Sequence, residues 1–143
     1  MTMKFTLQSL VVAGLMTLAQ AASAQVAVIV NPKSPMASMT PEQVAAVFLG
    51  KSNTLPSGAT AAPADLPESA VVREQFYSKA AGKTGAQVKA TWARLTFSGK
   101  ATPPKELTTA ADVKKFVANN PDAIGYIEKS AVDNTVKVVL IVE

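Results

Sequence analysis

The chain of 143 residues carries 14 basic and 10 acidic side chains, a formal net charge of +4, and has neither cysteine nor histidine. The usual zinc and copper ligands, the serine–histidine and cysteine–histidine catalytic pairs and a disulfide framework are therefore excluded. The charges are scattered, and Lys114–Lys115 is the only basic pair, so no clustered nucleic-acid-binding stripe is present. We expect no catalytic residues, no metal, no cofactor and no nucleic-acid partner, although a mild positive field suits small anions.

Residues 1–24 have the pattern of a secretory signal peptide. Lys4 precedes an apolar run from Leu7 to Leu18, and the run Ala22-Ser23-Ala24 forms a small-residue cleavage site. The apolar run is too short for a permanent membrane anchor. We expect a periplasmic protein that begins at Gln25 and forms one domain over residues 25–143.

The first elements of this domain are a strand and a capped helix. The β-branched run Val26–Val30 predicts a strand that is covered on both faces. Residues 31–35 contain two prolines and an asparagine, which indicates a loop. A helix is predicted from Met39 to Leu49, because Thr40 and Gln43 have the spacing of a capping box.

The stretch from Asp65 to Tyr77 follows a weaker strand expected at residues 59–63 and predicts a second helix. Asp65 and Glu68 have the spacing of an acidic capping box, with Pro67 in the first turn, while Phe76 belongs to an apolar face. A strand that leads into a helix N-terminus is also where α/β proteins hold anions. The stretch is therefore either a self-capped helix or the edge of an anion site.

Two further helices are predicted by the same kind of cap. Thr84 with Gln87 begins one, in which Trp92 has the spacing of a core residue and, as the alternative, could be a binding platform. Thr109 with Asp112 begins the other, which ends at residues 119–122, because the residue before Pro121 is disfavoured in a helix.

The C-terminal part is strand-like. Residues 123–127 form a short apolar run, in which Gly125 indicates a close approach of another segment, and residues 137–142 are mainly β-branched. The pattern predicts a compact α/β fold in the order β-α-β-α-α-α-β-β, with 26–30 and 137–142 in one sheet and with Phe76, Trp92 and Phe116 buried.

Three segments in this order carry a family resemblance: residues 47–51 (VFLGK), 73–76 (REQF) and 120–126 (NPDAIGY). Together they resemble the phosphate-binding proteins of bacterial ABC transporters, which have the type 2 periplasmic binding-protein fold. The resemblance implies a compact periplasmic-binding-protein-like domain, with a mixed sheet flanked by helices. It further implies two α/β lobes joined by crossing strands, a small oxyanion of the phosphate class at helix N-termini, and the membrane subunits of an ABC transporter as partners.

The resemblance places the anion at the helix start near Arg73, with two departures. The family has a Ser-Gly-Thr run just before the arginine, where residues 70–72 are Ala-Val-Val and offer no hydroxyl. The N-terminal strand and phosphate-holding loop of the family also have no counterpart here. The ligand-binding residues that we expect are Arg73, Ser69, Ala70, Asn31 and Ser34.

Two functions follow, and an enzyme is not expected. The first is a periplasmic solute-binding protein for a small oxyanion that acts with an ABC transporter. The second is a non-transport interaction domain that has kept the fold and lost the ligand site. Arg73 itself has an alternative role to ligand binding. Arginines more often form surface ion pairs, and here the partner would be Glu68 or Glu74.

Overall fold

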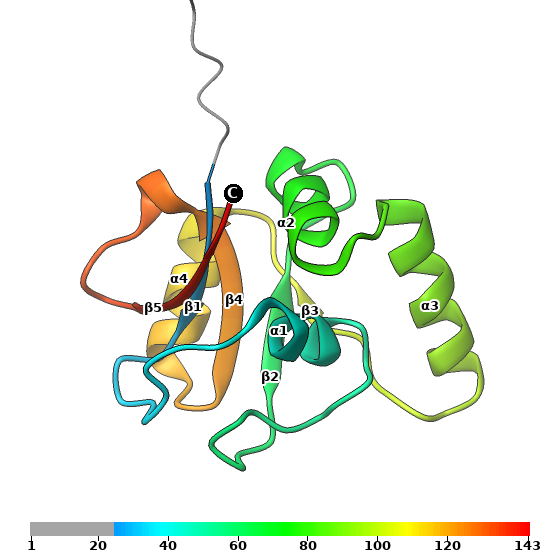
Figure 1. The fold of residues 1–143 in the computed structure, drawn as a ribbon, viewed down its shortest axis with the longest axis horizontal. Coiled ribbons are helices and arrows are strands. Elements are labelled where there is room, and N and C mark those ends of the chain that lie inside the picture. The colour runs from blue at the N-terminus through cyan, green and yellow to red at the C-terminus, as the bar shows by residue number, and fades with distance from the viewer. Residues whose placement is uncertain (1–24) are drawn as a thin grey trace, which may run out of the picture.

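A five-stranded mixed sheet organises residues 25–143, the part of the chain that this computed structural model describes (Figure 1). The predicted signal peptide, residues 1–24, lies outside the described residues. The strand order is β3-β2-β4-β1-β5. The strands are β1 (Val26–Val30), β2 (Ala62–Asp65), β3 (Lys105–Glu106), β4 (Ala123–Glu128) and β5 (Lys137–Val142).

The strand β1 is the inner strand of an antiparallel group. It pairs with β4 on one side and with β5 on the other, whereas β2 runs parallel to both β3 and β4. All five residues of β1 are buried, because side chains on both faces of the sheet are covered by helices or loops. The predicted strands at 26–30 and 137–142 are thus confirmed, and they are neighbours in one sheet.

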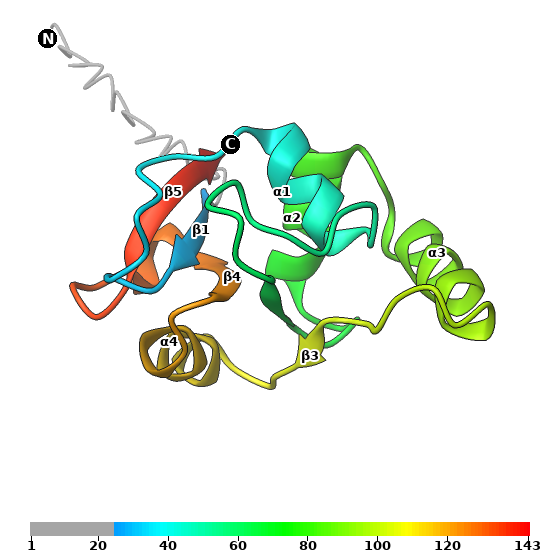
Figure 2. The same cartoon turned by 90° about the horizontal axis from the view of Figure 1, so that it is seen from below.

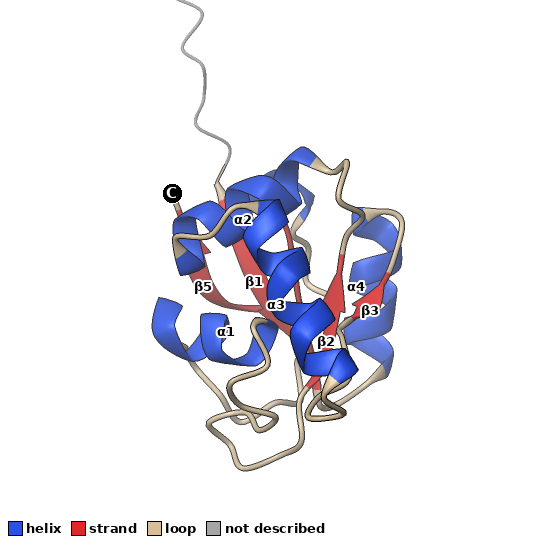
Figure 3. Ribbon diagram, turned by 90° about the vertical axis from the view of Figure 1, so that its right-hand side faces the viewer, coloured by secondary structure: helices blue, strands red, loops and turns tan. Residues whose placement is uncertain are grey.

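Three helices cover the two faces of the sheet. Figure 2 shows α4 (Ala110–Asn119) on one face and the pair α1 (Pro41–Phe48) and α2 (Val71–Ala81) on the other. The helix α3 (Gly85–Phe97) packs against α2 at the periphery, away from the strands (Figure 1), and it lies nearest the viewer in Figure 3. A short 3-10 helix, Lys129–Ala131, follows β4. The α/β class predicted from the sequence is confirmed.

The predicted caps are present at three helices. Thr40 and Gln43 form a reciprocal capping box at α1, and Thr84 and Gln87 form another at α3. The hydroxyl of Thr109 accepts a hydrogen bond from the Asp112 N–H at the start of α4. Each cap satisfies backbone donors that the first turn of a helix leaves without partners.

An aromatic cluster lies between the sheet and the helices α1 and α2. The Phe76 ring stacks on the Tyr126 ring of β4, with centroids 4.0 Å apart, and meets Phe48 and Tyr77 edge-on. On the other face of the sheet, a Cβ at Gly125 would lie 2.6 Å from the Val113 side chain of α4. The close approach predicted at this glycine is confirmed.

The second helix begins later than the sequence predicts. Asp65 is the last residue of β2, and α2 starts at Val71 with Ala70 as an N-cap that lacks a side-chain hydrogen bond. The predicted capping box of Asp65 and Glu68 is therefore wrong. Pro67 lies in a turn before the helix, where its carbonyl accepts a hydrogen bond from the Ala70 N–H. The weak strand expected at 59–63 is likewise displaced toward residues 62–65, because its pairing with β4 sets its position.

Two other expectations need correction. The resemblance implies two lobes, whereas the described residues form one sheet with its flanking helices. Phe76 is buried as predicted, but Trp92 and Phe116 are only partly buried. Trp92 is not a core residue because α3 lies at the periphery, and the Lys105 ammonium lies over the Phe116 ring.

The two ends of the described chain lie beside each other. The side chain of Gln25 donates a hydrogen bond of 2.6 Å to the Glu143 carboxylate, and Val26 is opposite Val142 in the pairing of β1 with β5. Figure 1 shows the C-terminus next to the start of β1.

Candidate functional site

Arg73 faces the interior from the first turn of α2. Only 8% of the residue is exposed, although arginine is rarely buried without a charged partner. Its partner is Asp65, the last residue of β2, with Nε and Oδ1 3.4 Å apart. The geometry is that of an ion pair, and Nε makes no hydrogen bond within the described chain. Neither Glu68 nor Glu74 is the partner in this pair, so the surface ion pair considered for Arg73 is not what the structure shows.

Asp65 is held by two tyrosine hydroxyls and a backbone amide. The Tyr77 hydroxyl, from the next turn of α2, donates to Oδ2 at 2.5 Å. The Tyr126 hydroxyl, from β4, donates to Oδ1, which also accepts the Leu66 N–H at 2.8 Å. We refer to Asp65, Arg73, Tyr77 and Tyr126 as the Asp65 cluster. Three donors and one cation replace the water that this buried carboxylate lost on folding.

The electrostatics of the Asp65 cluster keep both tyrosines neutral. Burial, followed by the charge of Asp65, raises the pKa of Tyr77 and of Tyr126 above the ordinary tyrosine value. Burial alone would lower the pKa of Arg73, but the Asp65 charge, together with smaller contributions from Tyr77, Tyr126 and Glu68, raises it overall. The guanidinium also lies over the Tyr77 ring, 5.2 Å from its centroid. The cluster is therefore a carboxylate held by neutral hydroxyls beside a permanent cation.

The surface around Arg73 is predominantly acidic. Two shallow hollows adjoin the residue, and the ionisable side chains that line them are four acids and two bases. The Glu68 carboxylate forms an exposed ion pair with Lys89 at 3.5 Å. An approaching anion would meet more negative than positive charge here. The four acids are Asp65, Glu68, Glu74 and Glu106, and the bases are Arg73 and Lys89.

The predicted hydrogen-bond donors Ser69 and Ala70 do not form a binding site together with Arg73. Ser69 is exposed in the turn before α2. The Ala70 N–H donates to the Pro67 carbonyl at 2.9 Å, and the Ala70 carbonyl accepts the Arg73 N–H. The apolar residue Val71 follows, with 69% of its surface exposed. This helix start therefore offers an apolar surface where the resemblance implies hydroxyl groups.

Asn31 and Ser34 lie at the other end of the sheet. Val30 is opposite Ile124 at the start of β4, whereas Asp65 is at the end of the parallel strand β2. Figure 1 shows the loop after β1 and the start of α2 at opposite ends of the sheet. The fold therefore does not bring the two groups together.

The polar groups of this loop are engaged within the protein. The Asn31 amide donates to the Val117 and Ala118 carbonyls at the end of α4, and its oxygen accepts the Lys33 N–H. The Ser34 carbonyl accepts a hydrogen bond from the Lys137 ammonium. These contacts attach the loop to α4 and β5, which is a structural role.

The sequence did not identify Asp65, Tyr77 and Tyr126 as a site. Tyr77 is one helical turn after Arg73, a spacing that places the two on one face. Nothing local relates Tyr126 to Asp65, because 61 residues separate them. Among residues 25–143 there is also no group of three or more acidic side chains that could hold a metal ion. No helix in the same range is long and apolar enough to cross a membrane.

Comparison with solved structures relates the arrangement to a known fold. A candidate phosphate ABC transporter substrate-binding protein from Clostridium perfringens, with bound phosphate, superposes with a TM-score of 0.66 at 20% identity, over 81% of this chain and 45% of that one. The fold is periplasmic-binding-protein-like. An ABC-type phosphate transport receptor from Vibrio cholerae superposes with a TM-score of 0.65 at 23% sequence identity. The superposition covers 81% of this chain and 46% of the receptor. PstS from Borrelia burgdorferi superposes with a TM-score of 0.60 at 15% sequence identity. The superposition covers 81% of this chain and 47% of PstS.

These similarities show the fold alone. The chain spans less than half the length of the three solved proteins. No protein-family model matches the sequence, and the comparison with curated proteins gives no match either.

Proposed function

We propose that the protein is a periplasmic, non-catalytic domain of the solute-binding type that acts as an interaction domain and holds no phosphate-class anion beside Arg73. The observation that carries this proposal is the Asp65 carboxylate, which lies against the Arg73 guanidinium. The Asp65 carboxylate therefore occupies the position beside Arg73 that a bound oxyanion would need.

The donors near Arg73 are already in use. Phosphate at neutral pH is largely doubly charged, and its burial requires many hydrogen bonds to replace its water. The hydroxyls of Tyr77 and Tyr126 both donate to Asp65. A phosphate ion would have to displace Asp65 and approach through the acidic surroundings described above, and both steps oppose binding.

The surface at the start of α2 supports the same proposal. The exposed Val71 lines a hollow whose other walls are mostly apolar and include Leu66, Ala70, Val72 and Ile127. This apolar surface is available for contact with another macromolecule.

A second candidate is binding of a small oxyanion in association with the membrane subunits of an ABC transporter. Arg73 favours it, because its buried Nε makes no hydrogen bond and one solved neighbour contains bound phosphate. In this candidate, a ligand would contact Arg73 from one of the adjoining hollows.

Titration calorimetry with inorganic phosphate and with sulfate separates the two candidates. We expect no saturable heat with wild type or with Ser69→Ala, which alters an exposed hydroxyl. Circular dichroism establishes that a third protein, Arg73→Gln, is folded before titration. Saturable binding by wild type that Arg73→Gln loses and Ser69→Ala keeps would overturn the proposal and establish the oxyanion function.

The proposed location has its own test. The pattern of residues 1–24 leads us to expect a periplasmic protein whose first residue is Gln25. Cell fractionation followed by mass spectrometry of the intact protein measures both properties. A chain that keeps Met1 and sediments with membranes would contradict this expectation.

A further inference from the structure

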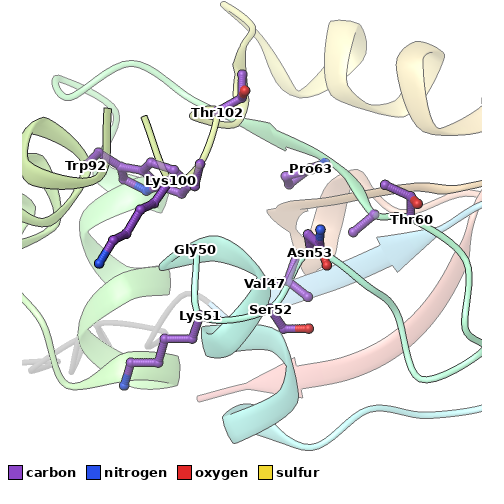
Figure 4. A pocket seen from close by; sticks show the side chains of 12 residues that line it. Val47, Gly50, Lys51, Ser52, Asn53, Thr60, Pro63, Trp92, Lys100 and Thr102 are labelled. Atoms are coloured by element: carbon purple, nitrogen blue, oxygen red, sulfur yellow. The ribbon is translucent and has the colours of Figure 1, made fainter. Parts of the chain in front are cut away.

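A large hollow of the described chain shares Trp92 with the smaller hollow beside Asp65 and Arg73. It has a volume of about 640 Å³ and is bounded by the end of α1, by α3 and the loop after it, and by the start of β2 (Figure 4). We call it the basic groove. Its lining residues include Lys51, Asn53, Thr60, Trp92, Lys100 and Thr102.

The charge of the basic groove is uniformly positive. Lys51 follows α1 and Lys100 follows α3, and in Figure 4 both side chains lie on the side of Trp92 and point away from Asn53 and Thr60. Of the twelve described residues that line the groove, none is acidic. This contrasts with the hollows around Arg73, where acids outnumber bases. A concave surface with one sign of charge concentrates ligands of the opposite sign.

Trp92 provides a fixed aromatic wall. Its indole N–H donates a hydrogen bond of 2.9 Å to the Phe48 carbonyl at the end of α1. A Cβ at Gly50 would lie 3.0 Å from the Trp92 ring, so the ring packs closely on this backbone. The indole is nevertheless only partly buried. A ring that is held in place and partly open offers a flat apolar face to a ligand at little entropic cost.

The remaining lining is polar and uncharged. Asn53, Thr60 and Thr102 are exposed and contribute an amide and two hydroxyls, which can both donate and accept hydrogen bonds. Such groups match a ligand with several hydroxyls better than a bare inorganic anion, which has few or no hydroxyls to donate. The groove thus combines a flat apolar face, neutral hydrogen-bonding groups and two cations.

We propose that the basic groove binds an anionic sugar, in which a ring with hydroxyls carries a phosphate or a carboxylate. The sugar ring packs on Trp92, the anionic group lies near Lys51 and Lys100, and the ring hydroxyls contact the neutral polar residues. This site is separate from Arg73, so it does not depend on whether the interaction function proposed above holds.

Trp92 is the only tryptophan of the chain. Its fluorescence reports on ligands in the basic groove and in the hollow beside Arg73, which it also lines, so variants of the groove lysines decide which of the two is occupied. The probes are glucose 6-phosphate and glucuronate, with glucose and inorganic phosphate as controls for the ring and for the charge alone. We expect a saturable fluorescence change with at least one anionic sugar, and affinity at least tenfold weaker for both controls. The stronger of the two anionic sugars identifies the preferred anionic group.

Matched variants test the location of the site. The double variant Lys51→Ala/Lys100→Ala should bind the preferred sugar at least tenfold more weakly, whereas Lys115→Ala, on the exposed side of α4, should bind it like wild type. All three lysines are exposed, and circular dichroism verifies that the variants are folded. The proposal is overturned if neither anionic sugar gives a saturable change, if inorganic phosphate binds as tightly, or if the double variant binds like wild type.

Discussion

The variant Asp65→Asn is expected to unfold with a free energy about 3 kcal/mol lower than wild type, because it removes the counter-charge of a buried arginine. Asparagine keeps the size of the side chain, so no cavity contributes. Arg73 would remain buried beside a neutral amide, and one of the two tyrosine hydroxyls would face an N–H₂ group in place of an oxygen. Urea unfolding followed by circular dichroism measures the change.

A matched control separates this effect from the loss of one negative charge. Asp122→Asn removes a carboxylate in an exposed turn and should change the free energy of unfolding by no more than about 0.5 kcal/mol.

If Asp65 stands in for a bound anion, phosphate should raise the unfolding midpoint of Asp65→Asn more than that of wild type or Asp122→Asn. Equal stability of the two asparagine variants would refute the structural role of the Asp65 cluster.

The variant Phe76→Ala is expected to lose about 4 kcal/mol of stability, near the middle of the range for a buried phenylalanine. The ring is 1% exposed, stacks on Tyr126 with an angle of 7° between the planes, and contacts Phe48 and Tyr77. Its removal leaves a cavity between α2 and the sheet. It also removes the surface that positions both tyrosine hydroxyls against Asp65.

The same chemical change on the surface provides the control. Phe97, at the end of α3, is 96% exposed, and Phe97→Ala should alter stability by no more than about 0.5 kcal/mol. The urea midpoint of each variant, compared at a constant slope of the transition, gives the two values. A loss for Phe76→Ala as small as that for Phe97→Ala would contradict the packing described here.

Where the information was local, the sequence predicted the structure well. The Thr40 and Thr84 capping boxes each involve groups three residues apart, and both formed as expected. The β-branched runs at 26–30 and 137–142 became paired strands. Short-range hydrogen bonding and side-chain branching decide these features before any long-range contact is made.

Where the information was long-range, the same reasoning failed. The spacing of Asp65 and Glu68 fits a helix cap, but Asp65 instead ends a strand. Its partners Tyr77 and Tyr126 are 12 and 61 residues away. No local pattern distinguishes a capping carboxylate from one that folding brings beneath two tyrosines. The separation of Asn31 from Arg73 has a related cause, because the strand directions that place them are set by pairing across the whole chain.

The hydrogen bond between the side chains of Gln25 and Glu143 has a consequence for the connectivity of the molecule. A short linker can join residue 143 to residue 25 without moving β1 or β5, and new ends can then be opened in the exposed turn at residues 56–58. The fold can be circularly permuted, or spliced as a unit into a surface loop of a larger host chain, because its entry and exit points need only a narrow gap.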